Sequence, residues 1–219
     1  MRTVLIGDVH GCVDELEALV VACGVRPGDD VILVGDLVAK GPDSQGVVQM
    51  CRERGYRAVL GNHDDAVLRR LNHSQTDDGR GAAHRAIGET LAAADVAYLE
   101  RLPLHVSIEE HGLIVVHAGF LPRVAIEAQR RTHMLNMRSL RPDGRPSTRA
   151  SEGTPWAASW PGPGHVVFGH DAMRGLQRHE HATGLDTGCV YGKALTALTL
   201  PGFQLVSVPA RRAWTPIEE

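Results

Sequence analysis

Apolar and polar positions follow two different periods in the first third of the chain. Three short apolar runs, Thr3–Ile6, Val31–Val34 and Ala58–Leu60, are rich in β-branched residues and predict buried strands. Between them, Asp14–Cys23 and Ser44–Arg54 carry apolar residues at helical spacing. This order predicts a β-α-β-α-β unit, which is typical of a parallel sheet covered by helices.

The rest of the chain predicts shorter and more numerous elements. We expect helices at Asp65–Leu71, His84–Leu99 and Arg123–Met134, and strands at Leu104–Ile108, Leu113–Val116, Val166–Phe168, Gly184–Asp186, Ala194–Leu200 and Phe203–Val208. Residues 72–81 are predicted to form a polar loop. Residues 141–164 are rich in Pro, Gly, Ser and Thr and show no clear period, which favours a lid or a flexible binding loop.

The number of strands exceeds what one parallel sheet can use. We therefore expect one domain over residues 1–219, with an α/β fold in which two mixed β-sheets form a sandwich flanked by helices.

Short polar loops follow the predicted strands. They carry Asp8, His10, Asp36, Asn62, His117 and His170, each beside a glycine or within two residues of one. Open α/β sheets place their chemistry at the carboxyl ends of the strands, so these side chains are expected to meet in one cavity. Oxygen and nitrogen donors without a thiolate suit Mn²⁺, Co²⁺, Fe or Zn²⁺. The pattern predicts a site for two divalent ions, with Mn²⁺ the first choice.

The spacing also suggests how the ligands divide between two ions. Asp8 and His10 lie two residues apart and can hold the first ion, while the Asp36 carboxylate can bridge both. The second ion is completed by Asn62, His117 and His170. A metal-bound hydroxide would then attack phosphorus. Taken singly, Asp8 or Asn62 could equally be a cap or turn residue, so the prediction depends on the whole set.

Five further residues are candidates for catalysis or substrate binding. His63 can act as a general acid, or else be a structural histidine that donates to a backbone carbonyl. Lys40 can bind a non-bridging phosphate oxygen. Asp64 is placed with these two as catalytic, although bonding of its carboxylate to loop amides is the stronger expectation. Arg138 and Tyr191 can bind substrate, or be a surface arginine and a packing tyrosine. No role is assigned to His73, His84, His105, His111, His133, His165, His179 or His181.

Composition narrows the class of protein. The net charge of -3 gives no broad attraction to nucleic acid or acidic membranes, so an anionic substrate needs metals and local cations. The chain begins directly with a predicted strand and contains no apolar span of ~20 residues, which favours a cytoplasmic protein without a membrane anchor. Its four cysteines show no C-x-x-C spacing, so the sequence indicates neither a thiolate zinc site nor a disulfide framework. The sequence does not indicate an oligomeric state.

The strand-end motifs resemble those of the metallophosphoesterases of the phosphoprotein-phosphatase superfamily, over nearly the whole chain. Residues 35–44 (GDLVAKGPDS) and 185–192 (LDTGCVYG) resemble the ApaH-like branch, which includes the symmetrical bis(5′-nucleosyl)-tetraphosphatases. The resemblance implies an α/β sandwich with a dimetal site between two sheets and the ligand roles given above. It also implies a dinucleoside polyphosphate substrate.

One position departs from the wider superfamily. Phosphoprotein phosphatases usually carry Asp-Arg where this chain has Ala39-Lys40, and that aspartate is thought to orient the general-acid histidine. Cleavage of an anhydride expels a phosphate oxygen that ionises at roughly pH 6. Protonation of the leaving group therefore matters less than it does for phosphoserine. We expect hydrolysis of diadenosine tetraphosphate to two ADP. A protein serine/threonine phosphatase, a polyphosphatase and a catalytically silent nucleotide-binding sensor remain alternatives.

Overall fold

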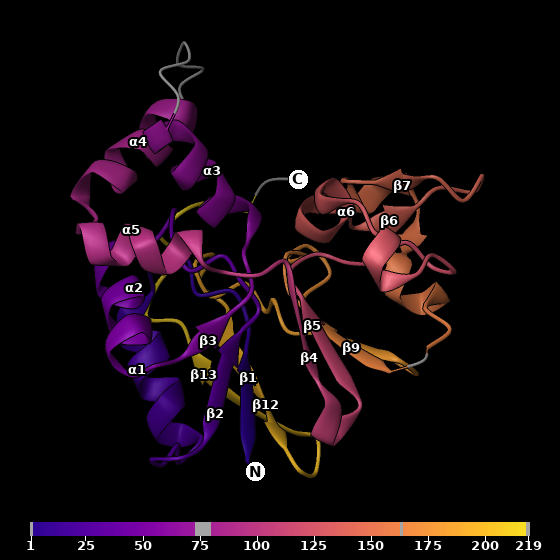
Figure 1. The fold of residues 1–219 in the computed structure, drawn as a ribbon, viewed down its shortest axis with the longest axis horizontal. Helices are drawn as coiled ribbons and strands as arrows, with labels where there is room; N and C mark the ends of the chain where they lie inside the picture. The colour runs from indigo at the N-terminus through magenta and orange to yellow at the C-terminus, as the bar shows by residue number, and fades with distance from the viewer. Residues whose placement is uncertain (1, 73–79, 163, 218–219) are drawn as a thin grey trace.

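The computed structural model describes residues 2–72, 80–162 and 164–217, and Figure 1 shows two sheets packed face to face. Most of the predicted polar loop 72–81 lies outside the described residues. The first sheet contains five strands, in the order β13 (Gln204–Pro209), β12 (Ala194–Leu200), β1 (Thr3–Ile6), β2 (Asp30–Leu33) and β3 (Arg57–Ala58). Strands β1, β2 and β3 are parallel, whereas β12 and β13 are antiparallel.

The second sheet also contains five strands. Their order is β10 (Gln177–His179), β11 (Ala182–Gly184), β9 (His165–Phe168), β5 (Leu113–Val116) and β4 (His105–Ile108). Its three central strands are parallel and its two edge strands are antiparallel. A short 3₁₀ helix, η1 (Glu109–His111), connects β4 to β5. The predicted sandwich of two mixed sheets is confirmed.

The interior between the sheets is apolar. Leu5 and Ile32 from the first sheet pack with Val115 and Val167 from the second, and all four are fully buried. The outer face of the first sheet is covered by α1 (Val13–Ala22) and α2 (Ser44–Glu53), as Figure 1 shows. Because both faces of β1 and β2 are buried, these strands are continuous apolar runs.

Two predicted helix boundaries require correction. The third helix, α3 (Asn62–Asn72), begins at Asn62 instead of Asp65, so the Asn62-His63 pair lies in its first turn. The predicted helix His84–Leu99 is two helices, α4 (Arg80–Thr90) and α5 (Ala93–Glu100). The break occurs at Ala92, whose backbone is extended.

Among the described residues, no helix is long and apolar enough to cross a membrane.

The predicted helix Arg123–Met134 is mostly wrong. The segment contains a 3₁₀ helix, η2 (Ile126–Ala128), and only then α6 (Arg131–Asn136). The Gln129 side chain donates to the carbonyls of Leu121 and Val124 and accepts from the Leu121 amide. These bonds satisfy backbone groups that a helix would have paired with one another.

Residues 141–164, expected to lack regular structure, carry two strands and two 3₁₀ helices. Strand β6 (Ser139–Leu140) pairs with β7 (Pro146–Ser147) and β8 (Thr154–Pro155), and η3 (Ala150–Glu152) and η4 (Trp156–Ser159) complete the unit. Trp156 is 1% exposed and packs on Phe168 of the second sheet. Two-residue strands give no readable period, which is why the sequence did not predict them.

Candidate metal centre and active-site pocket

The loops at the carboxyl ends of β1, β2, β5 and β9 meet the start of α3 at one end of the two sheets. Asp8, His10 and Asp36 have ligand atoms within 4.8 Å of one another, and so do Asp36, His117 and His170. The two groups share Asp36. The Oδ1 of Asn62 lies 3.0 Å from the Nε2 of His117. All six predicted ligands are therefore brought together, and we call them the ligand cluster.

Each imidazole of the ligand cluster is held by a backbone carbonyl. The Nδ1 atoms of His10 and His117 lie 3.1 and 2.9 Å from the carbonyl oxygens of Val38 and Val34, respectively. The Nε2 of His170 lies 3.1 Å from the carbonyl oxygen of Asn136. A carbonyl can only accept a hydrogen bond, so the bonded nitrogen carries the proton. The other nitrogen of a neutral ring then has a lone pair available to bind a metal ion.

These free nitrogens face oxygen atoms. The Oδ2 of Asp36 lies 3.5 Å from the Nε2 atoms of both His10 and His117. Burial is the main cause that lowers the pKa of His117 to about 4, and it also lowers that of His10 well below its ordinary value. Both rings are thus neutral near pH 7, and lone pairs converge without protons between them. This donor set fits divalent cations.

Three buried carboxyl groups lie beside one another in the same place. Burial raises the pKa of Asp8 well above its ordinary value, and the charges of Asp186 and Asp36 raise it further. Burial also raises the pKa values of Asp36 and Asp186 to about 6. A cation at the shared group would offset this crowded negative charge.

The backbone of these loops is held in an uncommon conformation. Five non-glycine residues of the site have positive φ, between 48° and 74°: His10, Asp36, Ala39, Lys40 and His170. Such strain clusters at functional sites and persists only when the surroundings enforce it. Gly61 and Gly169 allow the close approach, because a Cβ on either would overlap the carboxylate of Asp36 or Asp8.

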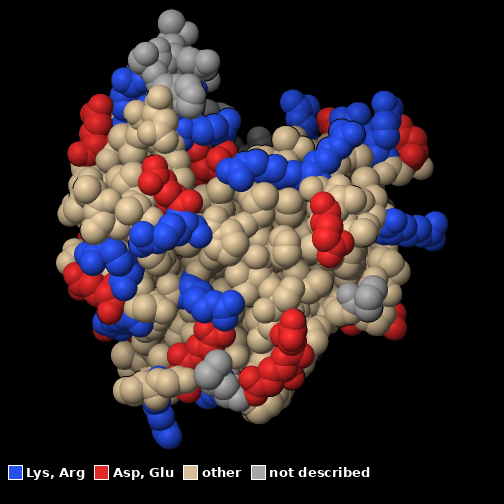
Figure 2. All heavy atoms as spheres, in the orientation of Figure 1, with Lys and Arg blue, Asp and Glu red and all other residues tan. Residues whose placement is uncertain are grey.

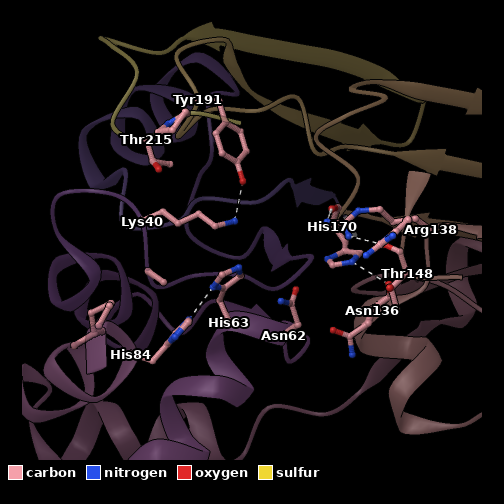
Figure 3. A pocket seen from close by; sticks show the side chains of 15 residues that line it. Lys40, Asn62, His63, His84, Asn136, Arg138, Thr148, His170, Tyr191 and Thr215 are labelled. Atoms are coloured by element: carbon pink, nitrogen blue, oxygen red, sulfur yellow. Dashed lines mark hydrogen bonds between the residues drawn. The ribbon is translucent and has the colours of Figure 1, made fainter. Parts of the chain in front are cut away.

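A pocket of about 570 Å³ reaches the ligand cluster at Asn62 and His170 (Figure 3). One side presents Arg138, Thr148 and Arg149. The opposite side is formed by α4, through Ala83, His84 and Ile87, and by Tyr191, Thr215 and Pro216 near the end of the chain. Figure 3 shows His63 and Asn62 between these two sides. The pocket thus carries cations on both sides, with Arg138 and Arg149 on one and Lys40 beside Tyr191 on the other, and the remainder of the second side is uncharged or apolar.

Residues 1–202 match the calcineurin-like phosphoesterase family. The chain belongs to this family. Its members use a dimetal site, and the two groups that share Asp36 fit that chemistry.

Two named enzymes and one solved structure are similar to this phosphoesterase over nearly their whole length. It is 33% identical to the symmetrical bis(5′-nucleosyl)-tetraphosphatase of an Enterobacter species, over 90% of this chain and 91% of the relative. It is 30% identical to the asymmetrical bis(5′-nucleosyl)-tetraphosphatase PrpE of Halalkalibacterium halodurans, over 97% of this chain and 95% of the relative. The crystal structure of a candidate diadenosine tetraphosphatase has 37% identity and a TM-score of 0.87, and covers 95% of this chain and 93% of its own.

The predicted phosphate-binding lysine of this phosphoesterase lies above the ligand cluster. Lys40 Nζ donates to the Tyr191 hydroxyl at 2.8 Å and lies 3.4 Å from the Nε2 of His10. Lys40 and Tyr191 therefore form a pair that lines the pocket.

Arg138 faces the same pocket from the opposite side. Its guanidinium donates to the backbone carbonyls of Thr148 and His170 at 2.8 and 3.0 Å, and its Nε is buried. These bonds fix the arginine beside His170, and each terminal nitrogen retains one further N–H for an anionic ligand.

Asp64, predicted among the catalytic residues with bonding to loop amides as the stronger expectation, is bonded to loop amides in the structure. Its carboxylate is fully buried and accepts from the amides of Leu37, Val38 and Gly61 at 3.0–3.2 Å. It is absent from the pocket lining. Burial and the charge of Asp36 raise its pKa to about 7. Asp64 thus joins the loop after β2 to the start of α3.

The sequence did not single out two residues at this site. Asp186 follows β11 and lies next to Asp8 and Asp36. Its place after a strand is the same signal that identified those two residues as candidate ligands, so the sequence could have identified it too. His84 of α4 lies 2.9 Å from His63, between the His84 Nε2 and the His63 Nδ1. A lone histidine in an Ala-rich helix gave no signal of its own. Away from the pocket, Cys12, Glu15 and Cys189 also form a buried group within 4.8 Å, which their spacing did not predict.

Proposed function

We propose that this phosphoesterase hydrolyses the phosphoanhydride of dinucleoside polyphosphates, and that diadenosine tetraphosphate is cut symmetrically into two ADP. The observation that carries the proposal is the ligand cluster, in which two buried groups share Asp36 and of which Asn62 and His170 line the pocket. Named symmetrical and asymmetrical tetraphosphatases among the relatives support the substrate class.

The pocket suits a ligand with a polyanionic middle and uncharged ends. Lys40 and Arg138 face the space above the ligand cluster and can bind non-bridging oxygens, although the net charge of the whole chain is -3. Figure 2 shows Lys and Arg side chains gathered along one edge of the molecule, beside the hollow between α3–α4 and the small β6–β7–β8 sheet. Tyr191, Ile87 and Pro216 offer apolar surface for a base.

The chemistry is an in-line displacement at an inner phosphorus. Water attacks, the bridging P–O bond breaks, and one ADP leaves through its terminal phosphate oxygen. Divalent ions in the ligand cluster would acidify the water and neutralise phosphoryl oxygens. Lys40 and Arg138 offset charge on the equatorial oxygens. His63 gives its proton to the departing oxygen.

A second candidate is asymmetrical cleavage, which yields ATP and AMP. It is favoured by the asymmetrical enzymes among the relatives, which match over nearly the full length of this chain. The two modes differ in which phosphorus lies over the ligand cluster, and therefore in how many phosphates lie on each side of it.

Product analysis tests the proposal. Purified chain is supplied with Mn²⁺ and incubated separately with diadenosine tetraphosphate, a phosphoserine peptide and long-chain polyphosphate, and the products are resolved by anion-exchange chromatography. We expect ADP as the sole nucleotide product. Equal amounts of ATP and AMP would support the asymmetrical mode. Turnover of only the peptide or only polyphosphate would replace the proposal with the corresponding phosphatase. Binding of the dinucleotide without turnover would indicate a nucleotide sensor.

A further inference from the structure

The ring of His63 is bound by a second histidine. The Nδ1 of His63 lies 2.9 Å from the Nε2 of His84, and the two rings are stacked at 5.2 Å with an interplanar angle of 30°. His63 lies in the first turn of α3 and His84 on α4. In Figure 3, a dashed line marks this bond, and the other ring nitrogen of His63 points toward the side of the pocket that holds Lys40.

The contact is held by the scaffold. Helices α3 and α4 pack so closely that a Cβ on Gly88 would lie 2.6 Å from Leu71. The backbone amide of His63 donates to the Oδ1 of Asp36 at 2.9 Å, which fixes the His63 main chain. Within the described parts of the chain, His84 is the one side chain that hydrogen-bonds the His63 ring. Ala39 lines the same pocket and has no polar group to offer.

We propose that His84 is a positioning residue: it holds the His63 ring through Nδ1, so that Nε2 faces the oxygen that leaves phosphorus. The inference rests on the proposed function, because a leaving oxygen exists only if the chain hydrolyses a phosphate ester or anhydride. The protonated His63 ring gives its Nε2 proton to that oxygen as the P–O bond breaks, keeps its Nδ1–H toward the Nε2 of His84, and afterwards takes up the proton released by the attacking water.

A histidine partner and a carboxylate partner have different chemical consequences. A carboxylate bound at Nδ1 would add a negative charge beside His63, whereas an imidazole orients the ring without adding one. A phosphate oxygen that ionises at roughly pH 6 needs less help to leave than an alkoxide does. Orientation by His84 therefore suits an anhydride better than an alkyl phosphomonoester.

Three substitutions of His84 test this role, with His181→Gln as a matched control on a partly exposed histidine outside the pocket. His84→Ala should lower kcat on diadenosine tetraphosphate about tenfold, with KM changed less than about twofold, because positioning acts on the chemical step. His84→Gln should recover most of the loss, since its amide can hydrogen-bond Nδ1. His84→Glu should raise the ratio of alkyl phosphomonoester to dinucleotide hydrolysis about tenfold.

Several outcomes overturn the inference. A raised KM with unchanged kcat in His84→Ala would make His84 a substrate contact. Equal losses in the Ala and Gln variants, with a lowered melting temperature in both, would make it structural. An unchanged ratio in His84→Glu would remove the selectivity.

A second readout does not depend on turnover. In ¹⁵N-histidine NMR, His84→Ala should shift the Nδ1 resonance of His63, while His181→Gln should leave it in place. An unmoved resonance refutes the inference even if the wild-type enzyme is active. A wild-type chain that hydrolyses no phosphate substrate refutes the proposed function instead, and the resonance still decides whether His84 holds His63.

Discussion

The ligand cluster and the rim of the pocket are built on different principles. The imidazoles and carboxylates of the cluster come from strand-end loops, are at most 6% exposed, and have rings fixed by backbone carbonyls. The pocket rim consists of His84, Arg138, Arg149, Tyr191 and Thr215. These five come from α4, the α6–β6 connection, the segment before η3, and two loops near the end of the chain. A rigid floor carries the chemistry that the family shares, whereas the rim can vary and set the substrate.

The largest expected effect on activity comes from replacing Asp36, which both groups of the ligand cluster share. Asp36→Asn keeps an oxygen for the His63 amide but removes the charge shared by both groups of the ligand cluster. We expect kcat/KM to fall by about 10³ or more, because two dications would lose their common counter-charge. The measurement is steady-state hydrolysis of diadenosine tetraphosphate together with metal content.

Asp14→Asn is the matched control for that variant. Asp14 lies on α1, is largely exposed and pairs with Arg211, away from the pocket. Its activity should equal that of the wild type. An Asp36→Asn enzyme with activity within tenfold of this control would remove Asp36 from the centre of the mechanism.

The next effect belongs to the boundary between floor and rim. His63→Asn should retain bound metal, because His63 lies next to the cluster without belonging to it. Its kcat should fall about 10²-fold on an alkyl phosphate and less on the dinucleotide, since an alkoxide needs more help to leave. Both substrates should be assayed alongside metal analysis. Equal losses on the two substrates, or loss of metal, would contradict a general-acid role.

The same contrast explains what the sequence could predict. Asp8, Asp36 and His117 each lie within three residues of the end of a buried strand. Strand ends of a parallel sheet meet at one edge, so their convergence followed from local pattern. The bonding of Asp64 to loop amides was anticipated, and one of its three partners, the Gly61 amide, lies only three residues before it; the other two, Leu37 and Val38, are long-range. The fold class followed from the count and type of the strands.

The rim could not be predicted in this way. His84 reaches His63 because α4 packs on α3, and that contact joins residues 21 positions apart in the sequence. Arg149 faces the pocket from a segment of two-residue strands that carries no period. Tertiary contacts of this kind leave no repeat in the sequence. The split of His84–Leu99 into two helices was missed because alanine fits the helix and the break equally well.

A change in folding stability is expected from Asp186, the buried carboxyl group beside the ligand cluster. The pKa of Asp186 is raised to about 6, mainly by burial, above an ordinary value of about 3.9. Its ionised form therefore costs folding free energy above pH 6, and the cost disappears below pH 4, where folded and unfolded chains are both protonated. Asp186→Asn should stabilise the metal-free chain at pH 7.5 on the order of 1–3 kcal/mol, and leave it unchanged at pH 3.5.

Urea denaturation in the presence of chelator measures this difference. The Asn Oδ1 can still accept from the Gly188 amide, so the comparison isolates the charge. A destabilised Asp186→Asn at pH 7.5 would mean that the carboxylate has a favourable partner that outweighs its burial.

The smallest effect is expected on the rim. Tyr191→Phe removes the hydroxyl that accepts from Lys40 at 2.8 Å but leaves the ring on the pocket wall. The freed lysine can still reach phosphate, so we expect kcat/KM to fall only about 2–5-fold, the size of one ordinary hydrogen bond. Tyr98→Phe, whose hydroxyl bonds the Tyr56 carbonyl outside the pocket, is the control for loss of a tyrosine hydroxyl. A loss of kcat/KM above a hundredfold would show that the Tyr191 hydroxyl matters to turnover as much as the residues of the ligand cluster do.

Metal stoichiometry tests the central claim most directly, namely that the ligand cluster is a two-ion centre needed for turnover. The chain is dialysed against chelator, titrated with Mn²⁺ and then with Co²⁺, and its bound metal and hydrolysis of diadenosine tetraphosphate are measured at each step. We expect activity to vanish on chelation and to return as two ions bind per chain, with Asp36→Asn binding fewer. Full turnover by a chain that retains no metal would contradict the account.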